Sequence, residues 1–395
     1  MSTDTHVTRS IKVPLRPDTL KWAMQRSRLE VESLARALRV TPERINAWRE
    51  GIEQPSYAQA KKLAQKLHIP FSQLFVPPPD QIQLPLPDFR RGPAHGKEPS
   101  PELVEAIYDA LRKRDWYRAY RHSTPHALCP FVGSATLDHH PEDVAQAIRD
   151  FVPVQALQRQ TTKWQQFLTK IVESVESIGI LVLRQGYVAT NTHRPYDPAE
   201  FSGFAIADEV APVIFLNNRD FVARLSFTLA HELAHIWLGQ SALDAELDTF
   251  EASTPSEDFC DRVAAELLMP SSLFVETWQG GDPFERAQEQ AFRFKVSAWA
   301  ALRRAQELGL IREGEYREAF IRIRRETKKE KRAREGGNFW TNIPIRNSPT
   351  FTKVVVQAAL RGEMSPKEVA SLLNLRLGTA LDYLEKKRHE VSPRL

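Results

Sequence analysis

A short run, Phe227 to Leu238, places three chemically active side chains in an otherwise apolar segment. His231 and His235 lie four residues apart, so on a helix both imidazoles leave the same face and can converge on one ion. Glu232 follows the first histidine and can act as a general base toward water without binding the ion. The apolar flanks predict a buried helix, where such polar groups are costly unless they have a function. The pattern is typical of zinc hydrolases.

A second acidic pair, Glu257 and Asp261, opens another expected helix with the same spacing of four residues. Catalytic zinc sites commonly complete a set of nitrogen ligands with a carboxylate and keep one position for water, so we expect Glu257 as the third ligand. Asp261, one turn later, could accept the free N–H of a ligating histidine and fix its tautomer. The alternative, a surface helix with paired His and Glu side chains, fits the apolar flanks poorly.

Over roughly residues 165–312 the chain resembles the ImmA/IrrE family of bacterial metallopeptidases. The resemblance is carried by residues 203–206, 211–217, 227–238, 257–261, 263–270 and 294–297. It implies that His231, His235 and Glu257 bind Zn²⁺ and that Glu232 is catalytic. It also implies that the substrate is a regulatory protein, such as a transcriptional repressor. Family members often have asparagine in place of Asp261 and alanine in place of Cys260.

Residues 17–76 have the pattern of short helices joined by tight turns, with Thr41 as a helix cap followed by Pro42. This segment resembles the repressor-like (XRE) helix-turn-helix family. The residues that carry the resemblance are 34–38, 40–42, 45–51, Pro55 and 62–64. The resemblance implies that the third helix enters the major groove of double-stranded DNA.

On that third helix Arg44, Asn46 and Arg49 are the candidate DNA contacts. Three residues depart from the family pattern, because Val31 replaces a common glutamine, Arg39 replaces a common glycine, and Glu43 places a negative charge near the phosphates. Two interpretations therefore stay open: a DNA-binding module, or a helical module that contacts protein.

The composition is that of a folded globular protein. The chain has 395 residues, which predicts two or three domains, and 42% of them are hydrophobic and 26% charged. The net charge of +4 and the pI of about 9.0 permit a nucleic-acid or acidic partner. Two distant cysteines, Cys129 and Cys260, suggest no disulfide framework. Because there is no bilayer-length apolar run and no signal-peptide pattern, we expect a cytoplasmic protein with no membrane partner.

We expect an α+β, mostly helical fold: an all-α helix-turn-helix domain, a zincin-like peptidase domain with a small sheet and the helix that carries the histidines, and a C-terminal helical segment. The expected boundaries are 1–16 for a flexible tail, 17–76 for the N-terminal domain, 77–101 for a proline-rich linker, 102–335 for the peptidase domain and 336–395 for the C-terminal helices.

Short apolar runs at 180–183, 204–207 and 213–216 predict strands of a small mixed or antiparallel sheet. By the resemblance, the run 213–216 is the candidate edge strand that holds the substrate backbone. The residue that stabilises the transition state stays open among His193, Tyr187 and Arg224. A simple ion pair is the plainest interpretation of Arg224.

The sequence therefore favours a zinc metallopeptidase coupled to a repressor-like DNA- or protein-binding module. Expected partners are a protein substrate or regulator (a repressor or a toxin), double-stranded DNA, and a second copy of the chain in a homodimer. The alternative is a non-proteolytic transcriptional regulator or antitoxin with a structural or idle metal site. A third interpretation makes metal or ligand occupancy a switch of DNA affinity. The presence of Glu232 favours a catalytic metal site, because a structural metal site needs only its ligands.

Overall fold

The computed structural model describes residues 11–79, 99–123, 128–244, 254–330 and 338–391. The chain divides into two compact units. The first contains Met1–Leu84 and His95–Glu105, and the second contains Pro85–Ala94 and Ala106–Leu395. Most of the expected tail and proline-rich linker, and the glycine pair at 336–337, lie outside the described residues. No helix in the described ranges is both long and apolar enough to cross a bilayer.

The first unit is a small bundle of short helices. Its elements are α1 (Pro17–Arg26), α2 (Val31–Leu38), α3 (Pro42–Arg49), α4 (Tyr57–Leu67) and the 3₁₀ helix η1 (Phe71–Phe75). Their apolar stripes meet in one core, in which Leu34, Trp48 and Leu63 are fully buried. α2 ends at Arg39, whose φ of 57° lies in the left-handed region. This conformation costs an ordinary residue about 1–2 kcal/mol, which explains why glycine suits that position.

The second unit is built on a mixed four-stranded sheet. The strands are β1 (Leu181–Gln185), β2 (Gly203–Ile206), β3 (Val213–Asn217) and β4 (Leu243–Asp244), in the order β1-β3-β2-β4. β3 pairs in parallel with β1 and antiparallel with β2, and β2 pairs antiparallel with β4. The three longer strands lie where the sequence predicts them.

The prediction that residues 213–216 form an edge strand is wrong, because β3 lies between β1 and β2. All five residues of β3 are buried. A continuous apolar run of this kind is typical of a strand covered on both faces and flanked on both sides, whereas a half-exposed strand alternates. The strand beyond β2 is β4, which has only two residues and left no pattern to recognise in the sequence.

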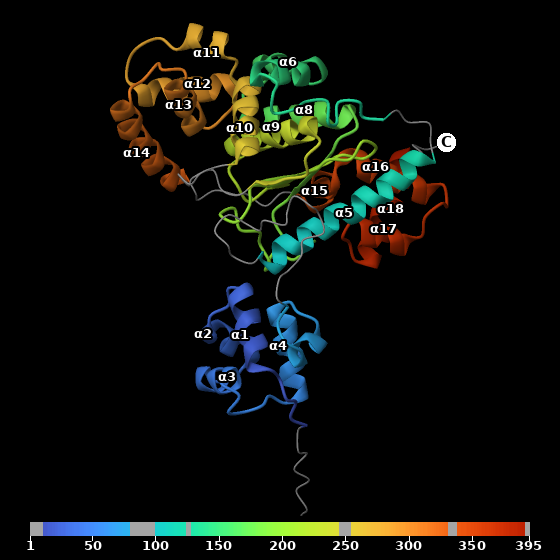
Figure 1. Ribbon diagram of the computed structural model, residues 1–395. Coiled ribbons are helices and arrows are strands. Elements are labelled where there is room, and N and C mark those ends of the chain that lie inside the picture. Colours follow the sequence, from blue (N-terminus) through green and yellow to red (C-terminus); the bar gives the residue numbers. More distant parts are fainter. Residues whose placement is uncertain (1–10, 80–98, 124–127, 245–253, 331–337, 392–395) are drawn as a thin grey trace, which may run out of the picture. The chain divides into compact units, whose positions relative to one another are not determined.

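Helices cover both faces of this sheet. On one face α8 (Trp164–Ser177) and α9 (Val222–Leu238) pack on the strands, and α10 (Pro255–Leu268) packs on α9 (Figure 1). α6 (Pro141–Phe151) also contacts α9 and α10. α9 ends at Gly239, whose φ of 68° provides a left-handed cap. Because α9 has neighbours on all sides, every residue from Thr228 to Trp237 is buried.

The remaining helices extend this core. They are α5 (Pro101–His122), α7 (Val154–Gln160), α11 (Ser271–Thr277), α12 (Pro283–Phe294), α13 (Ala298–Glu307), α14 (Glu313–Glu330), α15 (Phe339–Asn347), α16 (Pro349–Leu360), α17 (Pro366–Leu372) and α18 (Leu377–Val391). α15 and α16 pack against β1 on the face opposite α8 (Figure 1). The expected mostly helical α+β fold is confirmed.

A buried carboxylate joins the C-terminal helices to the sheet. Glu176, at the end of α8, is only 6% exposed. Its Oε1 accepts a hydrogen bond of 3.2 Å from the Val182 amide in β1, and its Oε2 accepts one of 2.8 Å from the Thr350 amide in α16. One side chain thereby satisfies two backbone donors that come from distant parts of the chain.

Replacing Glu176 by alanine should destabilise the second unit, because the amides of Val182 and Thr350 lose their acceptor. The expected cost is about 1–3 kcal/mol, seen as a lower midpoint of thermal unfolding in calorimetry. Glu173→Ala is the matched control, since Glu173 is exposed on the same helix. Equal midpoints for the two variants would contradict this role of Glu176.

Candidate metal centre

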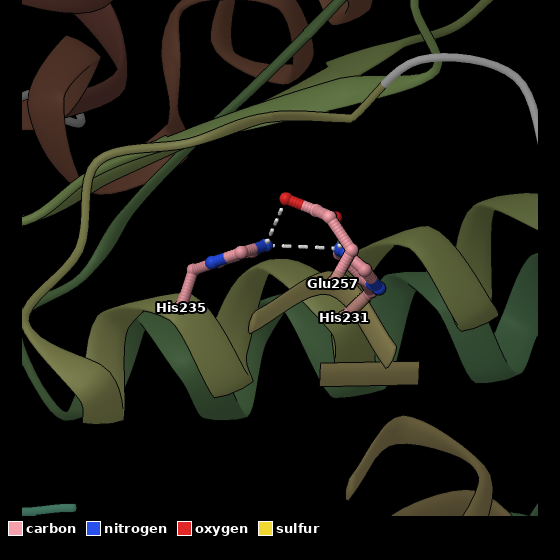
Figure 2. Close-up of side chains that lie close together, drawn as sticks. All are labelled: His231, His235 and Glu257. Atoms are coloured by element: carbon pink, nitrogen blue, oxygen red, sulfur yellow. Dashed lines mark hydrogen bonds and ion pairs between the residues drawn. The ribbon is translucent and has the colours of Figure 1, made fainter. Parts of the chain in front are cut away.

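The histidines of α9 lie on one face and point at a common position. The Nε2 atoms of His231 and His235 are 3.0 Å apart (Figure 2). Their side chains are 2% and 1% exposed. Helical spacing places both rings on the same side, and the packing of α9 removes them from bulk water. The prediction that these two side chains converge is therefore met by the geometry.

α10 supplies the carboxylate. The Thr254 side chain caps this helix by accepting from the Glu257 amide, which places Glu257 in the first turn. The two carboxylate oxygens of Glu257 lie 3.0 Å from Nε2 of His231 and 3.5 Å from Nε2 of His235. These three residues form the one metal-type cluster found in the described part of the chain, with ligand atoms within 4.8 Å of one another.

The protonation states of this cluster suit a cation. Nδ1 of His231 lies 3.0 Å from Oδ1 of Asp261, so in the tautomer with the proton on Nδ1 this carboxylate accepts it and the Nε2 lone pair is available to an ion. Burial lowers the pKa of His235, which favours its neutral ring. Burial alone would raise the pKa of Glu257, but contact with the two imidazoles lowers it, so this group is ionised.

Two neutral imidazoles and one carboxylate therefore meet at hydrogen-bonding distance. With metal–nitrogen bonds of about 2.0–2.1 Å, the ligand atoms of a tetrahedral ion lie roughly 3.3 Å apart. The spacings of 3.0 and 3.5 Å between the donors of His231, His235 and Glu257 agree with that value. The donor set and its spacing fit a divalent transition-metal ion, with one tetrahedral position left over.

Glu232 lies beneath strand β2 and is fully buried. A Cβ added at Gly203 would lie 2.9 Å from Oε1 of Glu232 and 2.7 Å from Cγ2 of Thr228. The lack of a side chain at Gly203 therefore makes room for the carboxylate. This role of Gly203 was not predicted, although a glycine at the start of an apolar strand is a known sign of close approach by another group.

Cys260 is a second residue whose place was not predicted. Its Sγ lies 3.5 Å from Nδ1 of His235, on the side of the ring away from the cluster. Burial raises the pKa of this thiol to about 12, so it stays protonated. Cys260 thus contacts His235 as Asp261 contacts His231. The signal in the sequence was its position directly before Asp261 on the same helix.

The other sequence candidates are placed elsewhere. Arg224 lies in the first turn of α9 and pairs with Asp220 at 3.6 Å, which is the simple ion pair that the sequence favoured. The hydroxyl of Tyr187 accepts from Arg219 at 3.1 Å. His193 is exposed in the segment between β1 and β2. Among the described contacts, neither Tyr187 nor His193 reaches the cluster.

The candidate DNA contacts all lie on α3 of the first unit. Arg44 pairs with Glu53 at 3.0 Å, and Nη1 of Arg49 donates to the side chain of Asn46 at 3.2 Å. Asn46 is exposed, and both arginines are partly exposed. Glu43 is fully exposed at the start of the helix, where a hydrogen bond to its own backbone amide lowers its pKa. It therefore stays negatively charged beside the two arginines.

Asp261→Ala should weaken binding of the metal by about 10–100-fold, because His231 loses the acceptor that fixes its tautomer. A chelator competition with Zn²⁺ or Co²⁺ as the probe measures the affinity. Asp258→Ala is the matched control, since Asp258 lies three residues away on α10, is exposed and pairs with the exposed Arg262. An affinity unchanged in Asp261→Ala would show that the carboxylate does not support the ligand.

Comparison with known families agrees with this geometry. Residues 175–306 match the family model described as the IrrE N-terminal-like domain, Peptidase_M78. A search of curated proteins finds no match. The matched segment contains all four strands, α9 with the two histidines, and α10 with Glu257. This segment of the chain is therefore similar to the IrrE N-terminal-like domain, which indicates a metallopeptidase-like domain.

Proposed function

We propose that this protein is a zinc-dependent metalloendopeptidase that cleaves a regulatory protein. The observation that carries the proposal is the convergence of His231, His235 and Glu257, with the buried Glu232 one residue after the first ligand. A zinc ion bound there would polarise the scissile carbonyl and lower the pKa of a water molecule. The match of residues 175–306 to a peptidase family supports the same chemistry.

Glu232 is the general base of this proposal. Its carboxylate takes a proton from the attacking water and passes it to the leaving amine, a role worth about 10²–10⁴-fold in rate. Burial under β2 at Gly203 limits its motion and keeps bulk water away. Asp261 and Cys260 hold the outer nitrogens of the two histidines, so the rings keep the orientation that the ligand atoms need.

The first unit brings the peptidase to its target in this proposal. In a helix-turn-helix unit one short helix lies in the major groove of double-stranded DNA. Here α3 carries Arg44, Asn46 and Arg49 on its surface. The ion pair of Arg44 with Glu53 and the charge of Glu43 reduce the positive potential of that face. Binding to promoter DNA is therefore expected to be weak and salt-dependent, and a regulator protein is the second target of this unit.

Glu232→Gln should abolish cleavage and leave the metal content unchanged, because the amide cannot accept a proton while the three ligands remain. The test incubates each metal-loaded variant with purified regulator and toxin proteins encoded beside this gene. Products are identified by gel and mass spectrometry, and metal by elemental analysis. Glu276→Gln, an exposed change on α11, should cleave as wild type does.

A product formed equally by wild type and Glu232→Gln would come from a contaminating protease. Stable complexes without any cleavage by metal-loaded wild type would overturn the peptidase proposal. They would favour the alternative of a non-proteolytic regulator or antitoxin, in which the metal cluster is structural.

Arg49→Ala should weaken binding of the chain to its own promoter fragment by about 1–3 kcal/mol, with Asn46→Ala following the same direction. Electrophoretic shifts at low salt measure the affinity, and repeated titrations give its salt dependence. Lys61→Ala, an exposed cation on α4, is the control and should change the affinity little. Failure of wild type to shift any promoter fragment at low salt would leave protein binding as the role of this unit.

A further inference from the structure

Arg303 of α13 faces the carboxylate that contacts a candidate ligand histidine. Its Nη2 lies 3.5 Å from Oδ2 of Asp261, while Oδ1 of the same carboxylate lies 3.0 Å from Nδ1 of His231. The exposed fraction of these side chains falls from 38% at Arg303 to 15% at Asp261 and 2% at His231. A line of three polar groups therefore runs from the surface of the second unit to the candidate metal cluster.

The guanidinium of Arg303 lies between two carboxylates. Its Nε donates to Oε1 of Glu307 at 3.2 Å, one turn later on α13, and its Nη2 faces Asp261. The donors of a guanidinium point in fixed directions within one plane, so two partners set its orientation. Arg303 is thus held beside Asp261 by a contact of its own helix.

The packing of α13 on α10 depends on the next residue, Arg304. Arg304 is buried, forms a salt bridge with Glu266 of α10, and donates from Nε to the carbonyl of Met269 at 3.2 Å. Consecutive helical residues point about 100° apart, so Arg303 and Arg304 reach different turns of α10. Removing the Arg303 side chain therefore leaves the anchor of α13 in place.

The two ligand histidines have outer partners of moderate strength. A carboxylate that accepts from a ligand imidazole makes that ligand more basic. At Asp261, the nearby cation stabilises negative charge on Oδ2, so less of that charge acts on His231 through Oδ1. At His235 the outer contact is Sγ of Cys260 at 3.5 Å, and a thiol sulfur is a weak acceptor.

We propose that Arg303 is a positioning residue that acts through Asp261 to limit the electron donation of His231 to the metal ion. The inference rests on the zinc site of the proposed function and adds a residue that tunes it. A less basic ligand set leaves more positive charge on a bound ion, which suits polarisation of a carbonyl better than the tightest possible binding does. Arg303 therefore lowers the metal affinity of the site.

The test measures the affinity of the full-length protein for Zn²⁺ by chelator competition. Arg303→Ala should bind Zn²⁺ about two- to fivefold more tightly than wild type, a modest gain because a half-exposed ion pair contributes little. This direction is specific, since a residue with a merely structural role would weaken binding when lost. In the Asp261→Ala background most of the gain should vanish, because the group through which Arg303 acts is gone.

Three further variants separate this role from packing and from net charge. Arg303→Lys keeps a cation beside Asp261 and should stay close to the wild-type affinity. Arg303→Gln has a similar length without the charge, should behave as Arg303→Ala does, and replaces it if the alanine variant does not fold. Arg262→Ala is the matched control, because Arg262 is an exposed cation of α10 that pairs with Asp258 at 3.3 Å. Its affinity should equal that of wild type.

Several results would overturn the assignment. They are a folded Arg303→Ala that binds Zn²⁺ no more tightly than wild type, a gain that persists in full in the Asp261→Ala background, or the same gain in Arg262→Ala. Wild type that binds Zn²⁺ but cleaves no protein would refute the peptidase function and leave the role of Arg303 to these affinities. If wild type binds no Zn²⁺, the proposed function and this inference both fail.

Discussion

The packing of α9 against α10 is the contact on which the rest of the site depends. α9 alone brings two imidazoles together, with Nε2 atoms 3.0 Å apart, but the set of three ligand atoms also needs a carboxylate. α10 provides it through Glu257, and its next turn provides Cys260 and Asp261 for the outer nitrogens. The sheet, α6 and α8 pack around α9, so the two histidine side chains are buried. The same enclosure makes each polar contact strong.

Local patterns predicted the parts of this site that depend on one helix at a time. The spacing of His231, His235 and Glu232 in an apolar run is sufficient to predict a buried, metal-type helix. Glu257 and Asp261 were recognisable because they repeat that spacing with acidic residues. The α+β class and the three longer strands followed from short apolar runs bounded by turn residues. In each case the signal lies within one element, so the sequence displays it directly.

Features that arise between distant elements could not be predicted in this way. Gly203 leaves room for Glu232 because β2 crosses that residue of α9. No local sequence pattern predicts which helix a strand will cross. The position of β3 inside the sheet depends on pairing with β1 and β2, whereas its apolar run alone indicates only burial. Cys260 contacts His235 because the packing of α10 on α9 places these two residues opposite each other. α15 continues through Pro344, although a proline normally indicates a helix end.

Asp261 has a position that couples two parts of the molecule. One carboxylate oxygen of Asp261 faces His231 and the other faces Arg303 of α13. The imidazole and the guanidinium therefore both polarise the same carboxylate. A displacement of α13 that draws Arg303 away would make Asp261 a stronger acceptor and His231 a more basic ligand. Through its two oxygens, this one carboxylate thus links the imidazole of His231 on α9 to the guanidinium of Arg303 on α13.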